Sequence, residues 1–213
     1  MMINPEMQFC DIRRNPCGKA GFSLVEFLIS STILVVLGAS VFSAITDIGR
    51  TASYQTEVQT VLQNTRIGMD TLARQIKQAG NNPLAATFEG ITIGSATQVQ
   101  IRSDLTGSAP GHPNQGDPDG DTSDVDENVT FRYDAGARAI EMVLGDGTVN
   151  RIASYISAFS MQYFDTTGSV TAVGADVRRI RVVISGATTL ANPKTGQRYG
   201  ITLTEDIDVS TRK

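Results

Sequence analysis

Tryptophan is absent from this chain, and histidine occurs once, as His112. Aromatic residues make up 6% of the composition, which leaves little material for an aromatic binding platform. A serine or cysteine nucleophile needs a neighbouring base, and His112 lies in the loop-like stretch APGHPNQ without a recognisable partner motif. The sequence therefore predicts that the protein is not an enzyme.

Cysteine and positive charge are also scarce. The two cysteines, Cys10 and Cys17, both lie near the N-terminus, and their spacing matches no metal-binding knuckle. Lysine and arginine total 18 against 22 acidic residues, which gives a net charge of −4. This acidic balance argues against nucleic acid or an anionic lipid surface as the main partner. No nucleic-acid partner is expected.

One long apolar segment stands out near the N-terminus. From Phe22 to Ile45 the only charged residue is Glu26. A helix over this segment is long enough to cross the roughly 30 Å hydrocarbon core of a membrane. A charged side chain inside such a segment costs about 2.5–3.5 kcal/mol even on insertion scales. We therefore expect Glu26 to have a partner.

Three interpretations of this segment compete. A secretory signal peptide has an apolar stretch of about 7–15 residues, which is shorter than the segment found here. A plain membrane anchor explains the length and the basic residues that precede it, but not Glu26. In the third interpretation a leader is cut off before the apolar segment, which then becomes the new N-terminus.

The stretch KAGFSLVEFLISSTIL resembles the type III signal of the type IV pilin superfamily, in which a polar leader ends in glycine and glutamate occupies the fifth mature position. Here these residues are Gly21, Phe22 and Glu26. The resemblance implies that a prepilin peptidase removes the leader 1–21, that the Phe22 amine is methylated, and that 22–45 forms a transmembrane or filament-core helix. Glu26 of one subunit would neutralise the Phe22 amine of its neighbour, which relieves two burial costs and sets the axial register.

The pattern beyond Ile45 predicts an amphipathic helix over 46–80, which ends at the stop signal Gly80-Asn81-Asn82-Pro83. The end of this segment, IGMDTLARQIKQAGNNP, resembles the helix end of PilW-type minor pilins and of the related J-type pseudopilins. Apolar residues recur at spacings of three and four and form one stripe: Tyr54, Val58, Val61, Leu62, Met69, Leu72 and Ile76.

The remainder, 81–213, is expected to form a β-rich head domain. Alternating patterns predict strands at 90–94, 97–103, 129–133, 140–144, 158–165, 177–185 and 199–210, and Asp146-Gly147 is typical of a tight hairpin turn. The stretches 106–127 and 186–198 are predicted loops. The expected fold class is α+β and pilin-like, with the second half of a long helix packed on an antiparallel sheet.

The stretch GDPDGDTSDVDE is dense in carboxylates and contains no basic residue. Its start resembles the first half of an EF-hand loop, but the later ligand positions do not match. Oxygen-only ligands on a loop suit Ca²⁺, and a solvated acidic loop is the alternative. The candidate calcium ligands are Asp117, Asp119, Asp121, Asp124, Asp126 and Glu127.

The resemblance implies a PilW-like minor pilin that takes part in assembly or initiation of a type IV pilus. The first alternative is a J-type pseudopilin of a type II secretion pseudopilus. A different class, a calcium-dependent tip adhesin or ligand-binding head, stays open because the loops 106–127 and 186–198 could face outward. The implied partners are the prepilin peptidase, other pilins contacted through the N-terminal helix, and an inner-membrane assembly platform. The implied location is the bacterial inner membrane, with a periplasmic head and a pilus-tip or cell-surface position after assembly.

Overall fold

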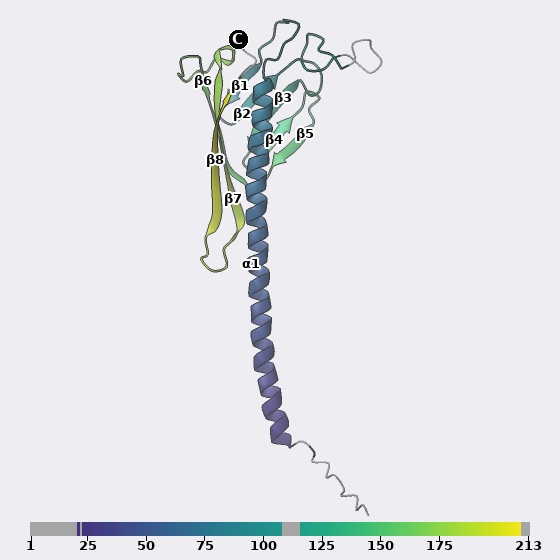
Figure 1. The fold of residues 1–213 in the computed structure, drawn as a ribbon, viewed down its shortest axis with the longest axis vertical. Helices are drawn as coiled ribbons and strands as arrows, with labels where there is room; N and C mark the ends of the chain where they lie inside the picture. The colour runs from purple at the N-terminus through teal and green to yellow at the C-terminus, as the bar shows by residue number, and fades with distance from the viewer. Residues whose placement is uncertain (1–20, 22, 108–115, 210–213) are drawn as a thin grey trace, which may run out of the picture. The chain divides into compact units, whose positions relative to one another are not determined.

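The computed structural model describes residue 21 and residues 23–107 and 116–209. The predictions made for the leader up to residue 20, for Phe22 and for His112 lie outside the described residues. The chain divides into two compact units, Met1–Thr46 and Asp47–Lys213. Helix α1 (Leu24–Gln78) runs through the boundary between them, and it confirms the long helix expected from the sequence (Figure 1).

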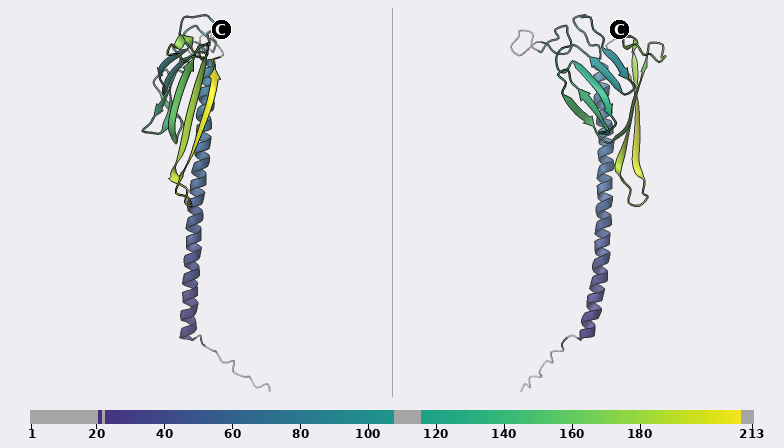
Figure 2. Two further views of the ribbon diagram at one scale, coloured as in Figure 1. Left: turned by 90° about the vertical axis from the view of Figure 1, so that its left-hand side faces the viewer. Right: turned by 180° about the vertical axis from the view of Figure 1, so that it is seen from behind.

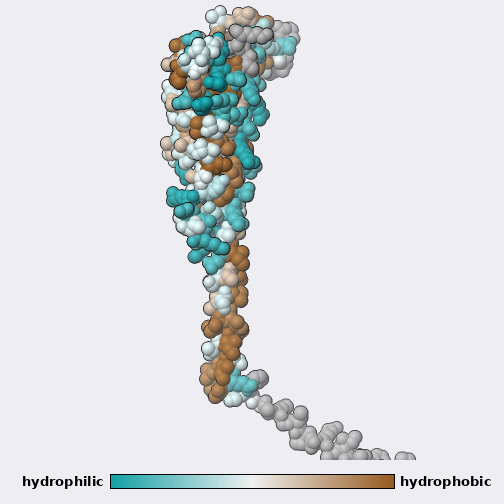
Figure 3. Space-filling view, turned by 60° about the vertical axis from the view of Figure 1, so that its left-hand side comes forward, coloured by the Kyte–Doolittle hydropathy of each residue, from teal (hydrophilic) through white to brown (hydrophobic). Residues whose placement is uncertain are grey.

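The first unit contains the apolar start of α1. Its large side chains are exposed, and Figure 3 shows apolar groups along this part of the helix. The hydroxyls of Ser31, Thr32 and Ser40 each donate a hydrogen bond to a carbonyl about one turn earlier, so these polar groups are satisfied within the helix. By length and composition, α1 is able to cross a membrane.

The second unit begins with the amphipathic part of α1. The predicted stripe is confirmed in part: Val61, Met69, Leu72 and Ile76 are buried. Its other members, Tyr54, Val58 and Leu62, are half-buried. Small residues, Thr65 and Gly68 among them, complete the buried face. Gly80, just after the helix, has a φ of 74°, the left-handed conformation that glycine adopts most easily at a helix C-terminus.

Two antiparallel sheets complete this unit, where the sequence predicted one. Five strands follow each other in order in the first sheet, β1 to β5, and three in the second, β6 to β8. Figures 1 and 2 show both sheets on the same side of α1, so the unit has two layers with the core between them. The elements are β1 (Ile91–Ser95), β2 (Gln98–Arg102), β3 (Asn128–Asp134), β4 (Ala139–Val143), β5 (Val149–Ala153), β6 (Ile156–Phe164), η1 (Gly174–Asp176), β7 (Arg179–Ala191) and β8 (Arg198–Asp208).

The core joins the helix to both sheets. Its largest fully buried side chains include Leu72 and Ile76 of α1, Phe131 and Ile140 of the first sheet, and Ile184 of the second. The predicted turn at Asp146-Gly147 is confirmed, because Gly147 has a φ of 85° and connects β4 to β5.

The predicted loop 186–198 is wrong over much of its length. Strand β7 continues to Ala191, and Ala191 pairs with Arg198 at the start of β8. The alternation also continues, since Gly186 and Thr188 are buried while the residues between and after them are more exposed. Small side chains concealed this period, because they carry little hydropathy contrast. The outward-facing loop assumed for an adhesive head is therefore reduced to the turn at 192–197.

Candidate functional site

Glu26 lies in the first turn of α1, where a negative charge favours the positive end of the helix dipole. Its side chain is exposed, and within the described part of the chain no hydrogen bond or ion pair engages its carboxylate. Gly21 is also exposed, two residues before the next described residue, Ser23. The carboxylate is therefore available to a group from outside the chain.

The helix around Glu26 is apolar on every side. Exposed fractions reach 75% at Leu24, 68% at Phe27 and 72% at Leu34, so the described residues leave the large apolar side chains of this segment uncovered. A helix that is apolar all round is suited to burial in lipid or among other helices. The exposed side chains include Val25, Leu28, Ile29, Ile33, Val35, Val36, Leu37, Val41, Phe42 and Ile45.

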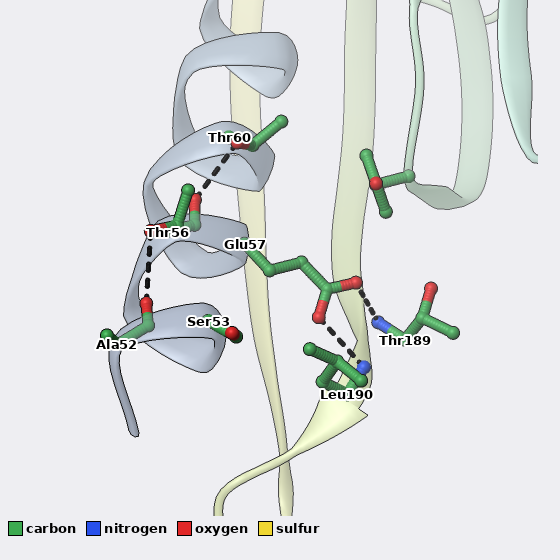
Figure 4. Close-up of a pocket in the computed structure, with 8 residues that line it drawn as sticks. Ala52, Ser53, Thr56, Glu57, Thr60, Thr189 and Leu190 are labelled. Carbon is green, nitrogen blue, oxygen red and sulfur yellow. Dashed lines mark hydrogen bonds between the residues drawn. The ribbon is translucent and has the colours of Figure 1, made fainter. Parts of the chain in front are cut away.

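A cavity of about 670 Å³ lies beside α1 within the second unit, at the lower end of the β7–β8 hairpin (Figure 4). The Glu57 carboxylate reaches across it: Oε1 accepts a hydrogen bond from the Thr189 N–H at 2.7 Å, and Oε2 accepts one from the Leu190 N–H at 2.8 Å. No sequence pattern distinguishes Glu57 from the other polar residues of this part of the helix. Glu57 acts as a clamp that ties the hairpin to α1.

Replacing Glu57 by alanine is expected to speed hydrogen exchange of the Thr189 and Leu190 amides. Hydrogen bonds to a charged acceptor contribute about 1.5–3 kcal/mol, which corresponds to at least tenfold faster exchange when the clamp opens locally. Glu57→Gln keeps one acceptor oxygen and should give a smaller change. Amides of the β3–β4 hairpin serve as the internal reference. Unchanged exchange of the Thr189 and Leu190 amides would show that Glu57 does not stabilise the β7–β8 hairpin against α1.

The acidic stretch is organised by local turns over its exposed part. The Asp119 carboxylate accepts the Asp121 N–H, and one oxygen of Asp121 accepts both the N–H and the hydroxyl of Ser123. These two hydrogen bonds from Ser123 lower the pKa of Asp121. Asp117 and Asp126 are exposed, and Asp124 is half-buried.

The six candidate ligands are not brought together as one cluster. Among the described residues no group of three acidic, histidine or cysteine side chains is placed to hold a metal ion. The alternative of a solvated acidic loop does not hold for Glu127, which is fully buried. It lies next to β3 and its backbone pairs with Ser103, whose N–H donates to the Glu127 carbonyl at 3.0 Å.

Asp104 is a site residue that the sequence reasoning missed. It is fully buried, and its two carboxylate oxygens accept the N–H groups of Asp119 and Gly120, each at 3.1 Å. Its own N–H donates to the carbonyl of Asn81, just beyond α1. A single Asp after a strand carries no distinguishing pattern, so only the fold reveals that it fastens the acidic stretch to the end of the helix.

A further charged cluster lies on the second sheet. Arg181 makes a two-pronged contact with Asp206 at 2.7 and 2.9 Å, and this arginine lowers the pKa of the Asp206 carboxyl. Arg179 and Arg181 both stack on the Phe164 ring, at 5.0 and 5.4 Å from its centroid. Phe164 contacts both arginines and Asp206 binds Arg181, so the cluster has a structural role in linking β6, β7 and β8.

No protein-family model matches the chain, and a search of curated proteins finds no matching relative. These comparisons identify no family. The functional argument therefore depends on the residues themselves and on the geometry described above.

Proposed function

We propose that this protein is a subunit of a type IV pilin-like filament, a minor pilin of the PilW type. The observation that supports this most directly is Glu26, the single charge in an exposed apolar stretch of a helix whose later part packs under a folded α+β unit. A membrane would cover the apolar stretch before assembly, and the helices of neighbouring subunits would cover it afterwards.

The energetics support an external partner for this helix. Burial of apolar surface contributes about 25 cal/mol per Å², so a helix with this many exposed large side chains gains many kcal/mol when it is covered. The Glu26 carboxylate would oppose this gain unless a cation accompanies it. The amine of Phe22 on a neighbouring subunit supplies that cation, and one ion pair then serves two groups that would otherwise be buried alone.

Processing provides the direct test. Mass spectrometry of protein extracted from membranes of the source cells should find a chain that begins at Phe22 and carries a methyl group on its amine. The expectation follows from Gly21 and Phe22 in front of the apolar segment. Gly21→Val should leave the leader attached, which serves as the matched control. An intact Met1 terminus, or a terminus beyond Ile45, would contradict the proposal.

Crosslinking then identifies the neighbours. A photo-crosslinker placed at exposed Phe27 should capture other subunits that carry the same kind of N-terminal helix. Captured pilins would support a pilus subunit, and captured pseudopilins would assign the protein to a secretion filament. Capture of lipid alone in cells that assemble filaments would argue against a filament role.

A further inference from the structure

Glu127 has an unusual environment for a carboxylate. Its side chain is fully buried, and Oε1 accepts the backbone N–H groups of Leu105 and Thr106 at 2.7 and 2.8 Å. Oε2 is also buried, yet it has no hydrogen-bond partner in the part of the chain that the structure describes. Buried polar atoms are paired in the great majority of cases, so this oxygen requires an explanation.

A change of protonation does not supply one. If Glu127 is ionised, Oε2 is an acceptor without a donor. If it is protonated there, the hydroxyl is a donor without an acceptor. Either form leaves one buried polar atom unsatisfied, which costs about 1–3 kcal/mol. A buried water or a positively charged ligand at Oε2 would remove the deficit.

The surroundings of Glu127 are rich in oxygen and negative charge. The buried residue Asp104 immediately precedes Leu105, whose N–H donates to Glu127 Oε1, so this hydrogen bond links Glu127 to the segment that carries the Asp104 carboxylate. Asp104 in turn holds the backbone at Asp119 and Gly120. The two described ends of the intervening loop, at Gly107 and Gly116, lie next to each other, because the Gly116 N–H donates a hydrogen bond to the Gly107 carbonyl at 3.2 Å.

We propose that Glu127 and Asp104 hold a divalent cation, Ca²⁺, at the base of this loop. Glu127 Oε2 is the anchoring ligand, Asp104 contributes a second carboxylate, and backbone carbonyls and water complete the shell. Ca²⁺ accepts six to eight oxygen ligands in flexible geometry, whereas Mg²⁺ demands a near-ideal octahedron. The exposed aspartates at 117, 119 and 121 raise the local negative potential without being required as ligands. This site is independent of the proposed role in a filament.

The test is calcium binding by the full chain in detergent, measured by calorimetric titration and by thermal unfolding in Ca²⁺, in Mg²⁺ and in chelator. We expect one Ca²⁺ per chain and a melting temperature that rises with Ca²⁺ more than with Mg²⁺. Extracellular calcium modules bind with a Kd on the order of 10⁻⁴–10⁻³ M, and we expect the same range here. Glu127→Gln and Asp104→Asn should each weaken binding at least tenfold.

Matched control variants distinguish binding at this site from nonspecific attraction of calcium to the negative charge of the protein. Asp70→Asn removes one exposed carboxylate from α1 and should leave the Kd unchanged. Asp121→Asn should weaken binding less than threefold. Circular dichroism without calcium checks that each variant is folded, and the titration of the parent protein is decisive by itself. Absence of binding by the parent, or unchanged binding by Glu127→Gln, would overturn the proposal.

Discussion

A Glu26→Ala subunit is expected to be cleaved and methylated like the parent protein but to be lost from assembled filaments. Under the proposed function, cleavage would depend on the leader and on Gly21, which the substitution leaves intact. Assembly would bring the Phe22 amine of a neighbour into an apolar environment with no carboxylate to meet it. Breaking a buried pair by removing one partner costs about 3–5 kcal/mol, which lowers incorporation by a factor of a hundred or more.

One further variant tests the charge of Glu26 separately from its shape, and a second serves as a control. Glu26→Gln preserves the shape of the side chain and should behave like Glu26→Ala if charge is what matters. Ser31→Ala is the matched control in the same helix, because the Ser31 hydroxyl is satisfied by the Leu28 carbonyl and should be dispensable. The measurement is the fraction of each variant in sheared filaments relative to membranes. If both Glu26 variants enter filaments as efficiently as the parent protein, the Glu26 carboxylate is not required for assembly.

Gly186→Ala is expected to destabilise the second unit by about 1–3 kcal/mol, the usual range for overpacking. A Cβ at this position would lie 2.5 Å from Thr65 Oγ1 and 2.9 Å from Val61 Cγ1, both on the buried face of α1. Loss of glycine also restricts the unfolded chain, which stabilises the fold by about 0.4–1 kcal/mol. The steric term is the larger of the two, so the net effect remains destabilising. Urea unfolding of the full chain in detergent measures it.

Gly200→Ala is the control for that experiment. Gly200 lies on β8 and pairs with Ala187, next to Gly186, but its Cβ would meet only the Gly186 carbonyl oxygen, at an ordinary 3.8 Å. We expect a change within about 0.5 kcal/mol. Equal destabilisation by the two substitutions would mean that alanine disturbs the hairpin itself and that the contact between helix and hairpin is not tight.

Local patterns predicted most of the secondary structure. The long apolar segment and the 3.6-residue period that follows it predicted the helix to within a residue or two of Leu24–Gln78. The two-residue period found strands where large side chains alternate with polar ones, but it missed β5 (Val149–Ala153). The prediction also failed at 186–191, where all residues but Leu190 are glycine, alanine or threonine. The physical cause is the nearby helix: its surface leaves no room for a side chain at Gly186, so the strand loses its hydrophobic signal where it packs most closely.

The sequence by itself determined the features that need no folding partner. A single carboxylate within a long apolar segment can be recognised without the fold, because a segment of that length and composition suits a membrane, where a charge is costly. Tertiary structure alone decided the roles of Glu57, Asp104 and Glu127. Glu57 binds an amide 132 residues away, and Glu127 binds amides 21 and 22 residues away. Such contacts follow from how the helix and the sheets pack, and no local pattern encodes which backbone groups the packing leaves for a carboxylate to bind.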